Sequence, residues 1–478
     1  MATHCGFMDA TNWSPGSLVS MRALNRVLAT GAGLGGLVLL LAGSVTARAG
    51  ELAWGAAYIG EYNTNVARTP TGEVSDWIHS PLVGLAYRER SSTLTLDFFG
   101  QAEYRKYQND SFDPQDLYYV AASGVWAIAP KQFYWTLGDL LRQVLKDPTA
   151  PDTPTNRITL NVFNTGPDAL IRVNPSNTLA LGLRYGNDTY SDHSADDYRY
   201  GGYGRWLYNI GTRATLSGNV EATVVRYLPP PAPATYLRND YRISNYYFGL
   251  TTRSPTLVGS LDLGWTNLNE LPGNVSAGDK PLVGHPLLRL TMTRQITRDE
   301  SGGIAARAEY TDAATSLLAR QTELGVQNPG GIGYLAEAPV ADPYFETRGE
   351  LFFVSKGASV IWDTRAVARQ LEYQYRTDLD RSELLGRVGA TYVWSPIMSA
   401  SLYGEYMQTA YDTTDRTDRD TTFTLRLVRR LTRSFSFAIE GGQDVRRSTD
   451  PAAEYVNYRG LVSLLYSTGP LYVPDKKM

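Results

Sequence analysis

Residues 213–224, RATLSGNVEATV, separate into two sets when every second position is read. One set is apolar or small: Ala214, Leu216, Gly218, Val220, Ala222 and Val224. The other set is polar: Thr215, Ser217, Asn219, Glu221 and Thr223. Successive side chains of a β-strand point to opposite faces. The stretch therefore predicts a strand with one face for an apolar phase and one face for water.

The same alternation recurs from Leu52 to the end of the chain, in segments separated by alternately short and long connections. This pattern is typical of a transmembrane β-barrel. We predict an all-β chain that forms a single large antiparallel transmembrane β-barrel of about 18–20 strands. The predicted strands include residues 303–315, 384–394 and 421–431. Short turns are expected to face the periplasm and long loops the cell exterior.

A soluble β-propeller or β-sandwich would also show alternation, because it too buries one face of each strand. Three features favour the membrane barrel. No blade motif recurs at a fixed period, and the polar faces carry too many charges for a packed core. The apolar faces also end in aromatic residues, as interfacial girdles do: Tyr104, Tyr185, Tyr310, Tyr392, Trp394, Tyr406 and Tyr466.

The composition excludes several other classes of protein. The chain has 478 residues with 32 Tyr, 44 Gly and a net charge of −3, a balance that gives no indication of nucleic-acid binding. After the N-terminus no apolar run reaches the roughly 20 residues of a transmembrane helix. Cys5 is the only cysteine, and it precedes the predicted export signal. Disulfides and thiolate chemistry are therefore not expected in the mature protein.

The N-terminal region resembles a secretory signal. Arg22 and Arg26 precede the apolar run 27–42, and Ala47-Arg48-Ala49 supplies an A-x-A cleavage site. We expect residues 21–49 to be the signal peptide and residues 50–478 to form the barrel. Residues 1–20 do not fit a signal, so we expect them to be a non-native extension and Met21 to be the true start.

Charged residues recur on the predicted inner faces. They are Asp97, Glu103, Arg105, Arg184, Glu221, Arg289, Arg307, Glu309, Glu346, Arg348, Glu350, Arg387, Glu405, Arg426, Glu440 and Arg459. One interpretation is a ladder of salt bridges that stiffens the wall, which we expect for most of them. The other is a polar conduit. Mixed charges with interleaved tyrosines suit a neutral or weakly acidic hydroxylated solute, since hydroxyls need donors and acceptors.

Catalysis is not expected. No nucleophile elbow or zinc motif is present. His79 adjoins Ser80 on the opposite face, and His285 has no evident partner. His193 lies in an acidic loop, where an Asp–His pair could activate water but more commonly forms a solvated turn. A second acidic cluster alternates with arginines, which argues for an exposed loop rather than a metal site: Asp412, Asp415, Asp418 and Asp420. We expect no cofactor and no metal.

Residues 161–168 spell N-x-F-x-T-G-P-D, and further short segments such as Glu103-Tyr104-Arg105 and Leu183-Arg184-Tyr185-Gly186 accompany them. With these motifs the mature chain resembles the outer-membrane β-barrel family associated with bacterial exopolysaccharide and PEP-CTERM systems. Such barrels usually end on an aromatic residue. Here Val462, Leu464 and Tyr466 are suitable, but residues 467–478 continue past them, as a periplasmic tail or a longer last strand.

The resemblance implies the bacterial outer membrane and a role in polysaccharide export, with no catalytic residue to carry over. The expected partners are the lipid bilayer, the barrel-assembly machinery and exopolysaccharide-secretion components, with no nucleic acid. The alternative is a structural or surface-interaction barrel plugged by the longest loop, 316–343. A remote alternative is a hydrolase in an outer loop. We expect Val220→Arg to impair membrane assembly and Glu221→Arg to leave folding nearly intact.

Overall fold

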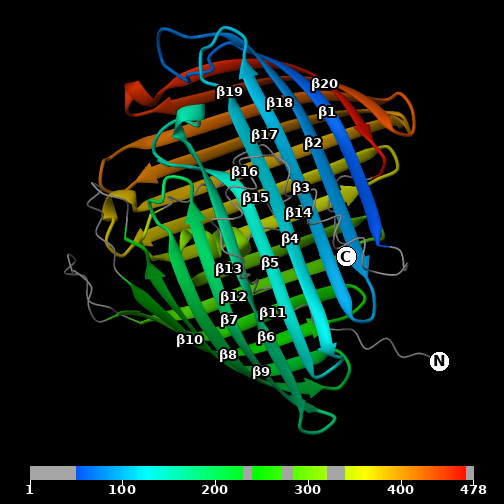
Figure 1. The fold of residues 1–478 in the computed structure, drawn as a ribbon, viewed down its shortest axis with the longest axis vertical. Coiled ribbons are helices and arrows are strands. Elements are labelled where there is room, and N and C mark those ends of the chain that lie inside the picture. The colour runs from blue at the N-terminus through cyan, green and yellow to red at the C-terminus, as the bar shows by residue number, and fades with distance from the viewer. Residues whose placement is uncertain (1–49, 230–239, 272–283, 320–339, 470–478) are drawn as a thin grey trace.

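The computed structural model describes residues 50–229, 240–271, 284–319 and 340–469. These residues form one closed β-barrel of 20 strands (Figure 1). Every strand pairs antiparallel with its neighbours in the sequence, and β1 pairs with β20 to close the barrel. Closure removes the free edges that an open sheet would expose to lipid. The predicted fold class is confirmed.

The strands of the first half are β1 (Glu51–Asn63), β2 (Asp76–Arg90), β3 (Leu94–Tyr107), β4 (Gln115–Ala129), β5 (Phe133–Leu145), β6 (Arg157–Arg172), β7 (Asn177–Tyr190), β8 (Asp197–Ile210), β9 (Ala214–Tyr227) and β10 (Tyr241–Arg253). Those of the second half are β11 (Leu257–Glu270), β12 (His285–Gln295), β13 (Glu300–Thr311), β14 (Tyr344–Lys356), β15 (Val360–Tyr373), β16 (Arg381–Ser395), β17 (Met398–Tyr411), β18 (Thr417–Arg430), β19 (Phe435–Ser448) and β20 (Tyr455–Ser467).

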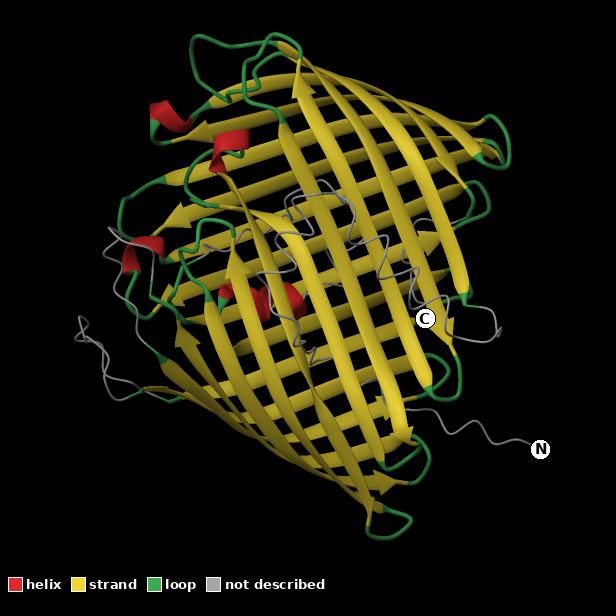
Figure 2. Ribbon diagram, viewed as in Figure 1, coloured by secondary structure: helices red, strands yellow, loops and turns green. Residues whose placement is uncertain are grey.

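The two ends of the barrel differ in their connections. Even-numbered strands run into short turns, which make up the short-turn end (Figure 2). Odd-numbered strands run into longer loops, which make up the loop end. The loop end also carries the 3₁₀-helices η1 (Pro154–Asn156), η2 (Thr377–Leu379) and η3 (Pro451–Ala453) and the helix α3 (Ala313–Ala319). None of the helices among the described residues is long and apolar enough to span a membrane.

Strand β9 shows how the alternation sorts side chains. Leu216 and Val220 are 41% and 51% exposed on the outer surface, whereas Asn219 and Glu221 are buried on the inner face. The same holds around the barrel, where large apolar side chains such as Phe248 and Leu263 are exposed. A water-soluble protein would not leave so many apolar side chains in solvent. The outer surface is therefore the face that contacts lipid.

Strand boundaries differ from the prediction mainly at the loop end. Residues 303–315 do not form one strand, because β13 ends at Thr311 and α3 follows. The Asp312 carboxylate accepts the Thr315 backbone N–H at 3.0 Å, which favours the helical turn. Strands β16 and β18 begin earlier than predicted, at Arg381 and Thr417. Their polar first residues look like loop in the sequence, but paired charges inside the barrel stabilise them.

The predicted outer girdle contains one error. Tyr104, Tyr392, Trp394 and Tyr406 are exposed, but Tyr310 is only 6% exposed. Its ring packs against His285 and Phe345, with ring centroids 5.4 Å apart in each case. The partner that His285 lacked in the sequence is thus this aromatic cluster. At the chain end β20 stops at Ser467, and most of the predicted tail lies outside the described residues.

Candidate functional site

The inner wall carries a continuous chain of ion pairs that runs from β8 to β16. Arg205 of β8 lies 2.9 Å from Glu221, and Arg289 of β12 contacts both Glu221 and Glu309, at 3.4 and 2.5 Å. The chain continues through the pairs Arg307–Glu309, Arg307–Glu346, Arg369–Glu346, Arg369–Glu383 and Arg381–Glu383. We call these nine residues the charged belt. Its members are linked side by side, so each buried charge has a compensating partner.

Strand register explains the order of the belt. Arg289 lies opposite Arg307, Arg307 opposite Arg348, and Arg348 opposite Arg369, which makes a row of arginines across β12–β15. Like charges directly opposite each other destabilise a sheet. The next inward position along the wall holds Glu309 opposite Glu346. The arginine side chains therefore contact the carboxylates of the neighbouring inward row. These contacts compensate the repulsion between the arginines.

Tyrosines accompany these arginines in mid-lumen. The Arg205 guanidinium lies 4.5 Å from the centre of the Tyr203 ring, and the Arg289 guanidinium lies 5.0 Å from that of Tyr247. The Tyr247 hydroxyl donates to Glu221. Arg387 lies 5.4 Å from the ring of Tyr403 in the same way. Such pairs combine ring faces with hydrogen-bonding groups on one wall.

A second set of tyrosines rings the loop end. Each is the first or last residue of its strand and lies on the inward side by alternation: Tyr107, Tyr190, Tyr227, Tyr241, Tyr344, Tyr373, Tyr411 and Tyr455. All but Tyr227, which is half-buried, are buried. Tyr344 and Tyr373, for example, pack with Leu379 of the loop after β15. This tyrosine collar anchors the loops on the barrel, and the sequence analysis did not identify it.

The structure places all the predicted inner-wall residues on the inward side of their strands. Those outside the belt form smaller groups. Asp97 contacts Arg88 and Arg90, Glu103 contacts Arg105, Arg348 contacts Glu350, Arg387 contacts Asp363, and Glu440 lies 4.0 Å from both Arg426 and Arg459. Glu405 of β17 lies directly opposite Arg387 of β16. These contacts fit the structural-ladder interpretation for most of the set.

The sequence analysis missed several charged residues of the belt and the inner wall, among them Arg199, Arg205, Arg369, Arg381 and Glu383. The first three lie on strands that were predicted, at positions in phase with the inner face, so alternation could have found them. Arg381 and Glu383 were missed because β16 begins three residues before the predicted strand. For Arg199, Arg205 and Arg369, the signal was an arginine in phase with other inward polar residues of the same strand.

The quoted motif 161–168 has a structural explanation. A Cβ atom at Gly166 would collide with the backbone carbonyl of Leu183 on β7, so glycine is required for the close approach of the strands. Asp168 then points inward, where its carboxylate contacts Arg184 at 2.7 Å and accepts the Tyr203 hydroxyl at 2.7 Å. The motif thus joins β6, β7 and β8 at the inner wall.

One sector of the inner wall is apolar. Side chains of β3–β7 form a cluster on which Ala314 and Leu317 of α3 pack: Phe99, Tyr119, Leu140, Val144, Ile158, Leu160, Val162 and Tyr190. Figure 2 shows α3 within the outline of the barrel. The described part of the 312–343 connection therefore folds inward. Of the predicted loop 316–343, residues 320–339 lie outside the described part of the chain.

Arg199 of β8 fastens α3 to the wall. Its guanidinium lies 2.8 Å from Asp312, 2.5 Å from Asp188 and 2.9 Å from Asp197, and it donates to the Thr315 hydroxyl at 2.8 Å. Burial opposes ionisation of Asp312. The Arg199 charge and the donors of Thr315 outweigh burial, so the pKa of Asp312 is lowered. Asp312 is therefore held as a carboxylate beside Arg199.

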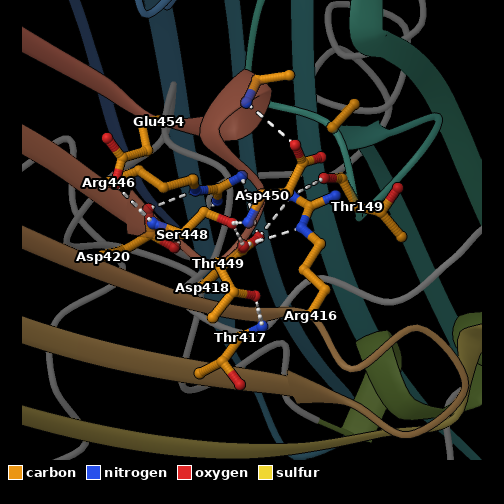
Figure 3. A network of polar contacts seen from close by, with 12 residues as sticks. Thr149, Arg416, Thr417, Asp418, Asp420, Arg446, Ser448, Thr449, Asp450 and Glu454 are labelled. Carbon is orange, nitrogen blue, oxygen red and sulfur yellow. Dashed lines mark hydrogen bonds and ion pairs between the residues drawn. The ribbon is translucent and has the colours of Figure 1, made fainter.

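A polar network at the loop end joins distant loops (Figure 3). Arg416 lies 2.6 Å from Asp418 and donates to the Thr149 carbonyl at 2.8 Å. Arg446 of β19 binds Asp420 at 2.8 Å and lies 3.7 Å from Asp418. The loop between β5 and β6 is thereby attached to the loop between β17 and β18, on another part of the wall.

The network corrects the prediction that this acidic cluster is wholly an exposed loop. Asp418 and Asp420 belong to β18 and face the inside, and Asp418 is 1% exposed. Asp412 and Asp415 remain in the exposed loop. Among the described residues no group of three or more His, Cys, Asp or Glu side chains is arranged to hold a metal ion.

The histidines have local partners. His193 Nδ1 lies 2.7 Å from the Asp196 carboxylate, whose other oxygen accepts the Tyr190 backbone N–H at 2.7 Å. His193 has a backbone φ of 55°, so this geometry is that of a tight turn. His79 lies on the outer surface between the Tyr58 hydroxyl, at 2.6 Å, and Gln108, at 3.1 Å.

A closed antiparallel barrel with an apolar outer surface and a charged interior defines the chain as an integral β-barrel protein of the bacterial outer membrane. No protein-family model and no curated protein matches it. Solved structures with a similar fold include the siderophore receptor PirA from Acinetobacter baumannii, with 7% identity and a TM-score of 0.47. The match covers 88% of this chain and 81% of that chain.

Two structures from Pseudomonas aeruginosa are also similar. A mutant form of the ferric enterobactin receptor PfeA has 9% identity and a TM-score of 0.45, with 88% of this chain and 81% of that chain covered. OccK2 (OpdF), in complex with glucuronate, has 8% identity and a TM-score of 0.37, with 88% and 98% covered. At such low similarity these proteins provide no argument about the solute or the partners of this chain.

Proposed function

We propose that the barrel is a conduit for a hydroxylated solute and takes part in exopolysaccharide secretion. The observation that carries this proposal is the charged belt with its tyrosines. Arginine supplies only donors, ionised glutamate only acceptors, and a sugar hydroxyl uses both. Tyr203 and Tyr403, which are half-buried, add aromatic rings suited to stacking on a sugar. The exopolysaccharide role itself rests on the resemblance of the sequence motifs.

The proposal also includes the partners. The apolar outer surface contacts the lipid bilayer, and assembly into the outer membrane is by the barrel-assembly machinery. Secretion components that deliver a polysaccharide would meet the short-turn end, which faces the periplasm in barrels of this type.

Helix α3 gives the conduit a narrowed lumen. It is seated on the apolar sector of β3–β7 and fastened by Arg199, so the described start of the 312–343 connection occupies space inside the barrel. Flux of a solute then depends on how firmly α3 is held. Leu317 is 5% exposed in this seat, and a charge at this position would be buried without a partner.

Single-channel conductance in planar bilayers tests the proposal. The intact protein is expected to conduct weakly, and Leu317→Asp, which displaces α3, is expected to conduct more strongly. Neutral maltooligosaccharides added to the chamber should reduce the current of the variant. Val220→Ala, on the outer surface, is the matched control and should behave as the intact protein. Absence of conductance in every form would contradict the conduit.

A second candidate is a structural barrel that is permanently plugged. The seating of α3 favours it, because both apolar contacts and ion pairs hold the helix in place. The same recordings separate the two functions. If the intact protein is closed and solutes cross only after α3 is displaced, the plugged barrel is the correct description.

A further inference from the structure

The short-turn end carries a ring of positive charges. Five strands that run toward this end finish on a basic residue, and these strands are spaced four apart around the barrel: β2, β6, β10, β14 and β18. The residues are Arg90, Arg172, Arg253, Lys356 and Arg430. All five are exposed. We call them the cationic ring.

The ring faces the lumen rather than the lipid. Residues directly opposite each other on antiparallel strands share a face. On β6, Arg172 lies four residues after the inward-facing Asp168, so it shares the inner face. On β18, Arg430 lies four residues after Arg426, which contacts Glu440 inside the barrel. Arg253 and Lys356 follow in phase after the inward Tyr247 and Glu350. By contrast, Arg294 and Arg429 near the same end are out of phase and point to the outer surface.

Most of the ring is not neutralised. Arg90 shares Asp97 with Arg88. For the other four cations, the described residues provide no carboxylate within ion-pair distance. Deeper in the lumen, the arginines of the charged belt are matched by glutamates. Among the described residues, the connections at the loop end carry exposed carboxylates, such as Asp110, Asp113, Asp147, Asp412 and Asp415.

The spacing of the ring indicates the size of its ligand. Neighbouring strands lie about 4.8 Å apart, so ring members four strands apart are separated by on the order of 20 Å along the wall. A small anion would contact one cation and gain little in water. A chain with repeated negative charges can contact several at once, and the gains combine through effective concentration.

We infer that the short-turn mouth of the barrel is a docking site for an anionic saccharide chain, such as a polyuronate. The inference deepens the proposed function, because it assigns a charge to the solute and an entrance to the conduit. A chain attracted to the cationic ring is brought to the lumen from the periplasmic side.

Direct binding tests the inference without relying on conductance. The detergent-solubilised barrel is titrated into fluorescently labelled oligogalacturonate, and polarisation is measured at low and high salt. The intact barrel should bind, and the quadruple variant R172Q/R253Q/K356Q/R430Q should bind at least about tenfold more weakly, since each lost contact contributes separately. High salt should reduce binding of the intact barrel toward that of the variant. A labelled neutral maltooligosaccharide of equal length should show no ring-dependent binding.

The matched control is the double variant R294Q/R429Q, which removes charges from the same end but from the outer surface. It should bind oligogalacturonate as the intact barrel does. Heat-modifiable migration on gels checks that each variant folds, and Arg172→Lys with Arg253→Lys should retain binding. Unchanged binding in the quadruple variant would overturn the inference.

Two further outcomes are informative. Equal loss in the double variant would overturn the inference in favour of a general attraction that includes lipid headgroups. Ring-dependent binding in a barrel that never conducts would leave the docking site standing and remove the conduit. Conductance without ring-dependent binding would support the conduit and overturn the docking site.

Discussion

The Arg199 guanidinium of β8 lies 2.8 Å from the Asp312 carboxylate, which immediately precedes α3. This contact joins the wall to the segment inside the lumen, across 113 positions of the chain. Arg199 also holds Asp188 and Asp197, so three carboxylates share one arginine. Among the described residues, Arg199 is the cation that all three of these acidic side chains contact.

Arg199→Gln should be far more damaging than Asp312→Asn. Loss of Arg199 leaves three carboxylates together without a cation, and breaking such buried pairs costs about 3–5 kcal/mol. Asp312→Asn leaves Arg199 with its two other acidic partners and should cost about 1 kcal/mol or less. Urea unfolding in detergent, followed by tryptophan fluorescence, measures the difference. Equal effects of the two substitutions would show that Arg199 does not organise the site.

The contact of Asp342 with the 375–376 backbone should depend on pH. Asp342 is 2% exposed and accepts the backbone N–H groups of Tyr375 and Arg376. Burial raises the pKa of Asp342 to about 7, although those N–H groups and the Arg376 charge lower it and Asp380 raises it. An acid with a raised folded pKa binds its proton more tightly when folded. The folded arrangement around the buried acid is therefore most stable below the ordinary pKa of Asp342, and this stability is lost as the pH rises through about 7.

Hydrogen exchange checks this dependence. After correction for intrinsic rates, the amides of Tyr375 and Arg376 should be more protected at pH 5 than at pH 8. Asp342→Asn, which cannot ionise, should show equal protection at both pH values. Protection that rises with pH in the unmodified protein would show that the hydrogen bonds, not burial, control the carboxyl group.

Gly166 and Gly349 form a matched pair for substitution by alanine. An added Cβ at Gly166 would collide with the Leu183 carbonyl, and one at Gly349 would meet nothing within 4 Å. Gly166→Ala should destabilise the barrel by about 1–3 kcal/mol, as overpacking does. Gly349→Ala should be neutral or slightly stabilising. Urea midpoints of both variants, compared with the unmodified protein, test the requirement for glycine in the 161–168 motif.

Val220 and Glu221 test the two faces of β9. Val220→Arg places a charge against lipid and should cost ~2–4 kcal/mol near the bilayer midplane. The expectation that Glu221→Arg is tolerated changes with the structure, because Glu221 is 1% exposed and contacts Arg205 and Arg289. A third positive charge there should destabilise the wall at least as strongly. Folding yield into liposomes measures both variants, with Glu221→Gln as the milder control.

Arg416 should hold the loop between β5 and β6 in place. Its guanidinium donates to the Thr149 carbonyl, and a hydrogen bond from a charged group contributes about 1.5–3 kcal/mol. Because Cys5 is the only native cysteine, a spin label at Ala150→Cys in a Cys5→Ser background reports on this loop alone. The label should become more mobile in Arg416→Ala. The same label should not respond to Arg447→Ala, whose side chain is 65% exposed and pairs with Glu454.

Much of the barrel was predictable because each strand reports its own orientation. Alternation in β9 separates Val220 from Glu221 without any knowledge of neighbouring strands. Prediction failed at the loop-end tips of strands such as β16 and β18. There Arg381, Asp418 and Asp420 resemble loop residues, since neither face needs to be apolar. It also failed at 312–319, where the alternation of β13 continues for a few positions before the helix begins.

The sequence by itself determined the closed barrel, its lipid-facing surface and the placing of charged residues on the inner wall, because period-two alternation is a local property of each strand. Only the tertiary structure decided which charges meet. The belt from Arg205 to Arg381 depends on strand register, and the cationic ring depends on where strands four apart end. The contacts of Arg199 with Asp312 and of Arg416 with Thr149 depend on barrel closure, which brings distant segments together inside one wall.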